Sequence, residues 1–432
     1  FRSFLNSSSD PPKRDREDFV SSYYLSDSQL PGQINKNSWY DRLLFDVERS
    51  GLILISGAVS SDGYSAQLVV GNADYALWSD AIAQHTALAD LHLPASVRIL
   101  NFVVEEAGHR SATIVVPRPS SYYSQDRGDL LRQVRILSGR TLQSPQHRTG
   151  FSTGKINNTV NVRTRFQLFD PDDPARYQFF AEIGSEYAIN NYWAIRSSIA
   201  LDIENNFDES NRKVSNSQLQ KVRSDVVRYL IEGDSGLEKL ILEGRNTWGR
   251  SIHYRVFGGY LESMYAGAGG EVLYWPHKSR VAVGMSLAYA KQRDFDRRFD
   301  LLDYSTVTGH ISAYWATPFY NYDLAVHAGR YLAEDVGATL EVRRTFRNGW
   351  QVGLWATLTD VPFDVFGEGS FDKGMYFQVP LDGLFGGSSR NAFSTRVRPI
   401  QRDGGQRLEN FSGDIFFDMR KARHDVFEFD ER

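Results

Sequence analysis

Cysteine is absent from the 432-residue chain, which excludes disulfides, thiolate metal sites and a cysteine nucleophile. The chain also lacks a run of about 18 apolar residues, the length that a membrane-spanning helix requires. Neither sign of charge dominates, because 49 basic and 53 acidic residues leave a net charge of −4. A basic face for nucleic acid is therefore not expected.

Motifs that carry catalysis or metal binding are also lacking. The sequence contains no HExxH, no phosphate-binding loop of the Walker type and no nucleophile elbow. The nine histidines show no ligand spacing. No pair of carboxylates stands out as a glycosidase pair, although the sequence does not exclude one. We therefore expect no enzymatic activity, no cofactor and no metal site.

Long alternating segments are present in the second part of the chain, from about residue 159. In one of them Ile311, Ala313 and Trp315 alternate with the polar His310 and Ser312. About 12 to 16 such segments occur, each near the ~10 residues that a tilted strand needs to cross a bilayer. Aromatic residues, at 13% of the chain, and 35 glycines suit a β-rich protein with many turns.

Either face of such a sheet can be the inside of the protein. In a soluble sandwich or barrel the apolar face is the core, whereas in a transmembrane barrel it meets lipid. Three features favour the second arrangement: the length of the segments, the aromatic residues near their ends, and arginines on the polar face. The dipeptide Asn348-Gly349 between two alternating runs predicts a hairpin.

The first part of the chain has a different pattern. Short apolar runs, including residues 42–47, predict buried strands, and residues 75–94 predict a helix that ends before a proline. The fold class expected is mainly β, with a C-terminal antiparallel transmembrane β-barrel preceded by a small α/β domain. The expected parts are a polar linker at 1–40, a small periplasmic α/β domain at 41–118, a connecting segment at 119–158 and the outer-membrane barrel at 159–432.

Two later stretches carry a family resemblance. FGEGSFDKGMYFQVPLD (residues 366–382) and RPIQRDGGQRL (residues 398–408) resemble the YjbH/GfcD-type exopolysaccharide-biosynthesis outer-membrane proteins, as do several strand segments between about residues 155 and 418. The resemblance implies an outer-membrane β-barrel encoded beside exopolysaccharide or group 4 capsule machinery, with a Wza-like exporter as a plausible partner. Members of that family are longer and carry a lipoprotein signal, so the chain is expected to be the C-terminal part of a larger protein.

The function expected is exopolysaccharide or capsule secretion or surface assembly, as a conduit or scaffold in the bacterial outer membrane with a periplasmic domain. The expected partners are the exopolysaccharide or capsular polysaccharide, outer-membrane lipid and the exporter, but not nucleic acid. The alternative is a soluble periplasmic β-rich protein that binds or modifies polysaccharide. The residues expected to line the lumen or polysaccharide path are Arg163, Arg165, Arg196, Arg255, Tyr314, Glu341, Arg343 and Trp355. The family-motif positions are Gly367, Glu368, Gly369, Phe371, Asp372, Lys373, Gly374, Arg402, Asp403, Gly404 and Gly405.

Overall fold

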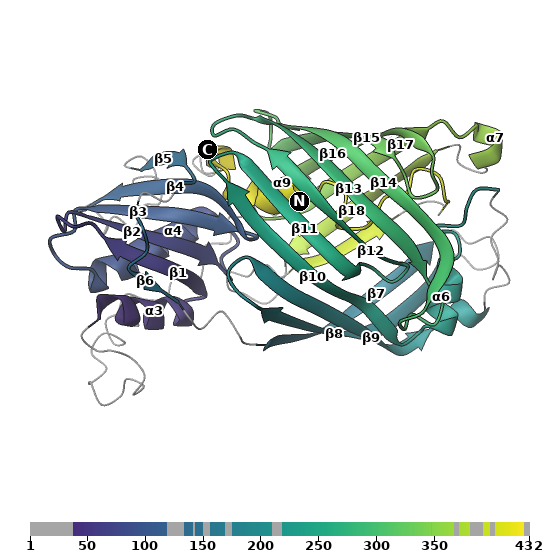
Figure 1. The fold of residues 1–432 in the computed structure, drawn as a ribbon, viewed down its shortest axis with the longest axis horizontal. Coiled ribbons are helices and arrows are strands. Elements are labelled where there is room, and N and C mark those ends of the chain that lie inside the picture. The colour runs from purple at the N-terminus through teal and green to yellow at the C-terminus, as the bar shows by residue number, and fades with distance from the viewer. Residues whose placement is uncertain are drawn as a thin grey trace.

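The protein is mainly β and contains two sheets (Figure 1). The computed structural model describes residues 38–118, 134–140, 143–149, 156–168, 175–209, 218–346, 348–366, 371–380, 392–397 and 402–426. None of the helices in these ranges has both the length and the apolar character needed to cross a membrane.

The first sheet has six strands in the order β5-β4-β3-β2-β1-β6. Strands β2 and β3 are parallel and are joined by helix α4, whereas the other neighbours are antiparallel. The elements are α3 (Trp39–Arg49), β1 (Leu52–Val59), β2 (Ser65–Asn72), α4 (Trp78–His92), β3 (Ile99–Glu106), β4 (His109–Pro117), β5 (Arg135–Ser138) and β6 (His147–Arg148).

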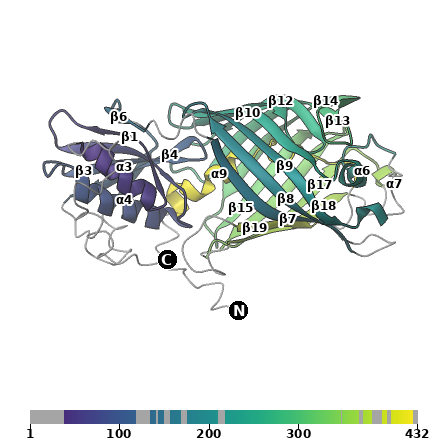
Figure 2. The same ribbon diagram turned by 90° about the horizontal axis from the view of Figure 1, so that it is seen from below.

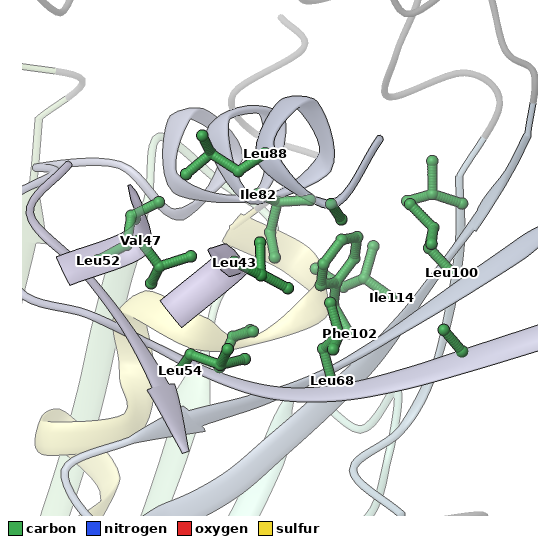
Figure 3. Close-up of a cluster of buried hydrophobic side chains, with 14 of the residues drawn as sticks. Leu43, Val47, Leu52, Leu54, Leu68, Ile82, Leu88, Leu100, Phe102 and Ile114 are labelled. Carbon is green, nitrogen blue, oxygen red and sulfur yellow. The ribbon is translucent and has the colours of Figure 1, made fainter. Parts of the chain in front are cut away.

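Helices α3 and α4 pack on the same face of this sheet (Figure 2). Their apolar side chains form one buried cluster with those of the strands, including Leu43, Ile82 and Phe102 (Figure 3). The predicted helix at residues 75–94 is confirmed as α4. The segment 119–158, expected to be only a connection, contributes β5 and β6 to the sheet.

The prediction of a strand at residues 42–47 is wrong, because these residues lie in α3. The buried apolar residues of α3 are Tyr40, Leu43, Leu44 and Val47, and Asp46 is buried beside them. They are spaced as one face of an α-helix, whereas a strand would bury every second residue. The apolar run was too short for its composition alone to distinguish the two.

The stability of this first sheet should depend on pH through His85 of α4. His85 is buried and its Nε2 lies 3.1 Å from the carbonyl oxygen of Gly71 in β2. Burial lowers the pKa of His85 to about 4. Because the folded-state pKa is depressed below the ordinary value of about 6.5, the stabilisation is complete above pH ~6.5 and is lost as the pH falls towards 4.

The expected loss at low pH is on the order of 3 kcal/mol. It is measured as faster hydrogen exchange of the α4 and β2 amides at pH 4.5 than at pH 7, after correction for the intrinsic rate. A His85→Gln variant can still donate to Gly71 and should not show this dependence. An equal pH dependence in the variant would assign the effect to another group.

The second sheet has 13 antiparallel strands, and each pairs with its neighbours in the sequence. The strands are long, up to the 16 residues of β14, against about 5–6 in an average globular strand. They are β7 (Ile156–Leu168), β8 (Ala175–Ala188), β9 (Trp193–Asn205), β10 (Gly236–Trp248), β11 (Ile252–Tyr260), β12 (Tyr265–Tyr274), β13 (Val281–Arg293), β14 (Leu301–Ala316), β15 (Tyr322–Arg330), β16 (Val336–Thr345), β17 (Gln351–Thr359), β18 (Asp372–Pro380) and β19 (Ala392–Val397).

This sheet is strongly curved, and its two edge strands approach each other (Figure 2). Parts of β7 and β19 come within 8 Å, measured between Cα atoms. Among the described residues no hydrogen-bonded ladder joins these two strands. The hairpin predicted at Asn348-Gly349 is confirmed between β16 and β17. Gly349 adopts the left-handed conformation (φ +80°) that such a turn requires.

The convex face of the second sheet is apolar and the concave face is polar. Ile311 and Leu287 are 70% and 56% exposed, whereas His310 and Ser312 are each 2% exposed. The apolar residues of the alternating pattern therefore point outward, as the sequence analysis expected. These residues therefore do not form a core in this sheet.

A segment near the C-terminus fills the space inside the curve (Figure 1). We call residues 402–426 the inner segment. The range expected for the barrel, 159–432, includes these residues, which form α9 (Ile415–Met419), η3 (Arg420–Ala422) and irregular chain. Their pattern of charged, aromatic and glycine residues does not alternate, and they pack against the concave face instead of extending the sheet.

Three further short elements complete the described chain: η2 (Phe207–Glu209), α6 (Val226–Glu232) and α7 (Phe363–Phe366). Helix α6 and the residues before it pack at the end of the sheet away from the first sheet (Figure 1).

Candidate functional site

The inner segment is held at its first end by Asp403, a residue of the RDGG motif. The Asp403 carboxylate is fully buried. Its Oδ1 accepts hydrogen bonds from the backbone N–H groups of Val222, Arg223 and Ser224 at 2.8–2.9 Å. Its Oδ2 accepts a bond of 2.6 Å from the Ser224 hydroxyl. One side chain thus joins the inner segment to the chain that leads into α6.

The other end of the inner segment contacts the first sheet. The Ser111 hydroxyl of β4 donates to the carbonyl oxygen of Ala422 at 2.5 Å, and Ala422 belongs to the buried cluster of the first sheet. The first sheet also contacts β10 directly, because Arg110 donates to the carbonyl oxygen of Thr247 at 3.2 Å. The inner segment therefore runs through the interior of the second sheet. Its first end is bound to the residues before α6, and its other end is bound to the first sheet.

Buried ion pairs hold the middle of the inner segment. Arg255 of β11 donates to Glu271 of β12 at 2.9 Å and to the carbonyl oxygen of Asn410 at 2.6 Å. The same Glu271 oxygen accepts a bond of 2.8 Å from the backbone N–H of Gly413. Arg255 and Glu271 are 2% and 3% exposed, so each charge depends on the other for compensation.

Aromatic rings form a second contact between this segment and the wall. Phe416 of α9 stacks on Trp275 and on Tyr314, with ring centroids 4.4 and 4.5 Å apart. The Tyr314 hydroxyl donates to the carbonyl oxygen of Gly413 at 2.8 Å. Tyr314, which was expected to line the lumen or polysaccharide path, is covered by the inner segment.

Arg420 gives the segment a further ionic anchor. Its guanidinium group lies 2.7 Å from Asp323 of β15 and 2.9 Å from Asp425. Arg420 and Asp323 are both almost fully buried. The sequence analysis missed these residues, as it missed Glu243 and Glu271, because their partners are identified only by strand register and by the position of the inner segment.

The arginines expected to line a lumen lie on the concave side but are paired with carboxylates. Arg163 pairs with Glu182, and Arg165 lies 2.6 Å from Glu238. The remaining pairs follow the same rule: Arg196 with Glu186 and Glu243, Arg255 with Glu271, and Arg343 with Glu341. These side chains thus stabilise the interior, and the structure separates Arg163, Arg165 and Arg196, on β7 and β9, from Glu341, Arg343 and Trp355, on β16 and β17.

Glu341 and Trp355 of the second group line a polar pocket between the wall and the inner segment, which we call the seam pocket. It contains about 540 Å³ of atom-free space, part of it open to solvent. The wall contributes Glu341, Trp355, Asp372, Tyr376 and Arg396 to its lining, and the inner segment contributes Arg407, Glu409 and Asp414.

Two aromatic residues of this pocket lie over glycines of the neighbouring strand. Trp355 of β17 is opposite Gly374 of β18, and Tyr376 of β18 is opposite Gly353 of β17. A Cβ atom on Gly374 would lie 2.4 Å from the Trp355 ring, and one on Gly353 would lie 2.1 Å from the Tyr376 ring. Both rings therefore occupy space that only glycine leaves free.

The two family motifs meet at this pocket. The Gln406 amide donates to Asp372 at 3.0 Å, and the Trp355 indole N–H donates to the other oxygen of Asp372 at 2.8 Å. Gly405 takes a left-handed conformation (φ +73°) and donates its N–H to Asp335 at 2.7 Å. This contact between two motifs more than 30 residues apart could not be read from either motif alone.

The remaining motif positions have local roles where the structure describes them. Lys373 lies 4.1 Å from the centroid of the Phe371 ring. Gly404 lies against Phe366, where a Cβ atom would approach the ring to 2.7 Å. Arg402 is half-buried at the start of the inner segment. The positions Gly367, Glu368 and Gly369 lie outside the described residues.

We expect Asp403→Ala to release the first end of the inner segment. The change would leave three buried N–H groups without their acceptor and should lower the free energy of unfolding by about 3 kcal/mol. The Asp403→Asn variant keeps Oδ1 and should lose about 1 kcal/mol. Urea unfolding in detergent measures both, and limited proteolysis should cleave the inner segment faster in the alanine variant. Equal losses in the two variants would contradict this account.

Within the described ranges no group of three or more His, Asp or Glu side chains is arranged to hold a metal ion. His310 and His327 lie on the neighbouring strands β14 and β15 and point into the interior. The Ser312 hydroxyl lies 2.8 Å from Nδ1 of His327. The arrangement is that of a polar interior.

Comparisons with known proteins agree with the motif resemblance. The family model described as "Exopolysaccharide biosynthesis protein YbjH" matches residues 8–417. The chain is 38% identical over 388 residues to a protein of Escherichia coli (strain K12) described as "Uncharacterized lipoprotein YjbH". That alignment covers 76% of this chain and 55% of the relative, so the chain spans about half the length of the curated relative it matches.

A likeness to a solved structure is weaker. The structure of Salmonella typhi OmpF in complex with daunomycin aligns with 61% of this chain and 96% of that chain, at 11% identity and a TM-score of 0.31. A score at this level supports no statement about fold or function.

Proposed function

Because the chain belongs to the YjbH family of exopolysaccharide biosynthesis proteins, we propose that it is an outer-membrane β-barrel protein that takes part in the secretion or surface assembly of an exopolysaccharide. The observation that carries the proposal is the reversed polarity of the 13-stranded sheet. Its outward face exposes apolar side chains such as Leu287, Ile311 and Leu354, at 56%, 70% and 54%. Exposure of so many apolar residues to water would be costly, whereas lipid accepts them.

The filled interior favours a scaffold or a gated path over a permanently open conduit. Asp403, Arg255 and Arg420 hold the inner segment along its length. In the proposed arrangement β7 and β19 close the wall, and the first sheet stands on the periplasmic side. There it is available to dock a polysaccharide exporter of the Wza kind, and the protein acts without making or breaking bonds.

The test is location together with polymer yield. The full-length protein is expressed in its bacterial host, the envelope is fractionated, and the gel mobility of boiled and unboiled samples is compared. We expect the outer-membrane fraction, a mobility shift on boiling, and a loss of surface exopolysaccharide on gene deletion that the gene restores.

A soluble periplasmic protein with no mobility shift would contradict the proposal and favour the alternative, a periplasmic protein that binds or modifies polysaccharide. A deletion strain that secretes normal amounts of polymer with altered linkages or substituents would favour an enzyme. Normal polymer in every respect would remove the link to exopolysaccharide.

A further inference from the structure

We propose that the seam pocket is a binding site for an uncharged saccharide unit. This inference rests on the proposed function for the kind of ligand, and it adds the ligand's chemical class and the place where it binds. The pocket is partly open to solvent.

Two aromatic side chains of the pocket, Trp355 and Tyr376, suit the faces of a sugar ring. A sugar ring has apolar C–H faces, and an aromatic ring that lines a pocket offers them a flat apolar surface. Trp355 and Tyr376 both line the pocket, and each lies over a glycine of the neighbouring strand. The indole N–H of Trp355 is held by Asp372 at 2.8 Å, so its ring is fixed before a ligand binds.

The hydrogen-bonding groups of the pocket are mainly acceptors. Four carboxylates line the pocket, namely Glu341, Asp372, Glu409 and Asp414. An ionised carboxylate accepts about four hydrogen bonds, so a lining rich in carboxylates is suited to a ligand that donates hydrogen bonds. Hydroxyl-rich ligands supply the donors that such a lining requires.

The charged side chains of the pocket distinguish uncharged from acidic saccharides. Two guanidinium groups line the pocket, and each already has a carboxylate partner. Arg407 lies 3.8 Å from Glu341, and Arg396 lies 3.7 Å from Glu409. An anionic sugar would bring a fifth negative group to four carboxylates and two arginines, and it would have to displace an existing pair to gain a cation. The lining therefore discriminates against uronic acids and other acidic sugars.

The site lies between two parts of the chain, so a ligand bound there can affect their relative position. The wall strands β16 to β19 supply one side, and the inner segment supplies the other. A saccharide bound there contacts both, so binding energy is available to favour one position of the inner segment over another.

The experiment measures binding to the full chain purified in detergent. The probes are uncharged tetrasaccharides of different linkage, namely cellotetraose, maltotetraose and β-1,4-galactotetraose, with tetragalacturonic acid as the anionic counterpart. Calorimetry gives the affinity, and saturation-transfer NMR shows which sugar protons approach the protein. At least one uncharged probe should bind more tightly than the anionic one.

Variants locate the site. Trp355→Ala should weaken binding about tenfold, and Trp355→Phe, which keeps a ring, should weaken it less. The matched control is Trp248→Ala, because Trp248 is 73% exposed at the end of β10 and does not line the pocket. Glu409→Lys, at a half-exposed position, should improve the affinity for tetragalacturonic acid several-fold.

The outcomes separate this inference from the proposed function. Tighter binding of the anionic probe, no binding of any uncharged probe, or equal effects of Trp355→Ala and Trp248→Ala would each overturn the saccharide site. Envelope fractionation of the same protein decides the membrane location independently, so either proposal can fail while the other stands.

Discussion

A Leu287→Arg variant should fail to accumulate as a folded protein in the outer membrane. Leu287 lies at the middle of β13, opposite Gly309 at the middle of β14, and points outward with 56% of its surface exposed. If the outer face meets lipid, an arginine at this depth costs about 2–4 kcal/mol. Combined with Leu340→Arg on the same face, the cost approaches the whole stability of a typical domain. The measurement is the fraction of protein that shows heat-modifiable mobility in isolated outer membranes.

Phe319→Arg is the matched control, because Phe319 is 60% exposed but lies in the turn between β14 and β15. Near the membrane surface the same change costs only about 0–1 kcal/mol, so this variant should assemble normally. If Leu287→Arg assembled as well as Phe319→Arg, the outer face would not meet lipid, and the proposed location would fail with it.

Arg255→Ala should be the most destabilising single change inside the sheet. Arg255 is 2% exposed and lies between Glu271 and Glu243, which are 3% and 2% exposed. Removal of the guanidinium group takes the cationic partner from the buried Glu271, whereas Glu243 keeps Arg196 and Arg245. It also removes the bond to the carbonyl oxygen of Asn410. Loss of one member of a buried pair costs about 3–5 kcal/mol. Urea unfolding of the purified protein in detergent measures this loss.

Two comparisons distinguish the effect of losing the ion pair of Arg255 from the effect of losing the packing of its side chain. Arg163→Ala removes an arginine that is more than half exposed and should cost less than about 1 kcal/mol. The double variant Arg255→Met with Glu271→Gln keeps most of the volume and removes one uncompensated charge, so it should be more stable than Arg255→Ala. If the double variant were no more stable, the packing of Arg255 would matter more than its charge.

Much of the second sheet was predictable because its signals are local. Alternation identified the strands and the polarity of their faces, and Asn348-Gly349 identified a hairpin. Even the pair of Arg255 and Glu271, which the sequence analysis did not find, lies directly across adjacent strands and follows from the register of one hairpin. Register is fixed by turn geometry and by the face that each residue occupies. A correct prediction of the turn between β11 and β12 would therefore have identified this pair.

The inner segment was not predictable in the same way. Asp403 binds residues about 180 positions earlier, and Ala422 binds a residue 311 positions earlier. No local pattern in residues 402–426 distinguishes a segment that fills the interior from one that continues the wall. The seam pocket exists only because the inner segment lies against the wall. The sequence therefore identified several wall residues of the pocket, but not the pocket itself or the residues that the inner segment contributes.

The inner segment follows the 13 described strands of the second sheet in the sequence, and this sets an order for assembly. All 13 strands leave the ribosome before the residues that fill the space between them, and Ala422 must find Ser111 across a separation of 311 residues. Contacts so distant in sequence form late, since a long loop must close before they stabilise anything. Biogenesis should therefore pass through an intermediate whose wall has formed around an empty, hydrated interior. In that state the buried carboxylates Glu271 and Asp323 still face water, and the final step is their dehydration as the inner segment enters.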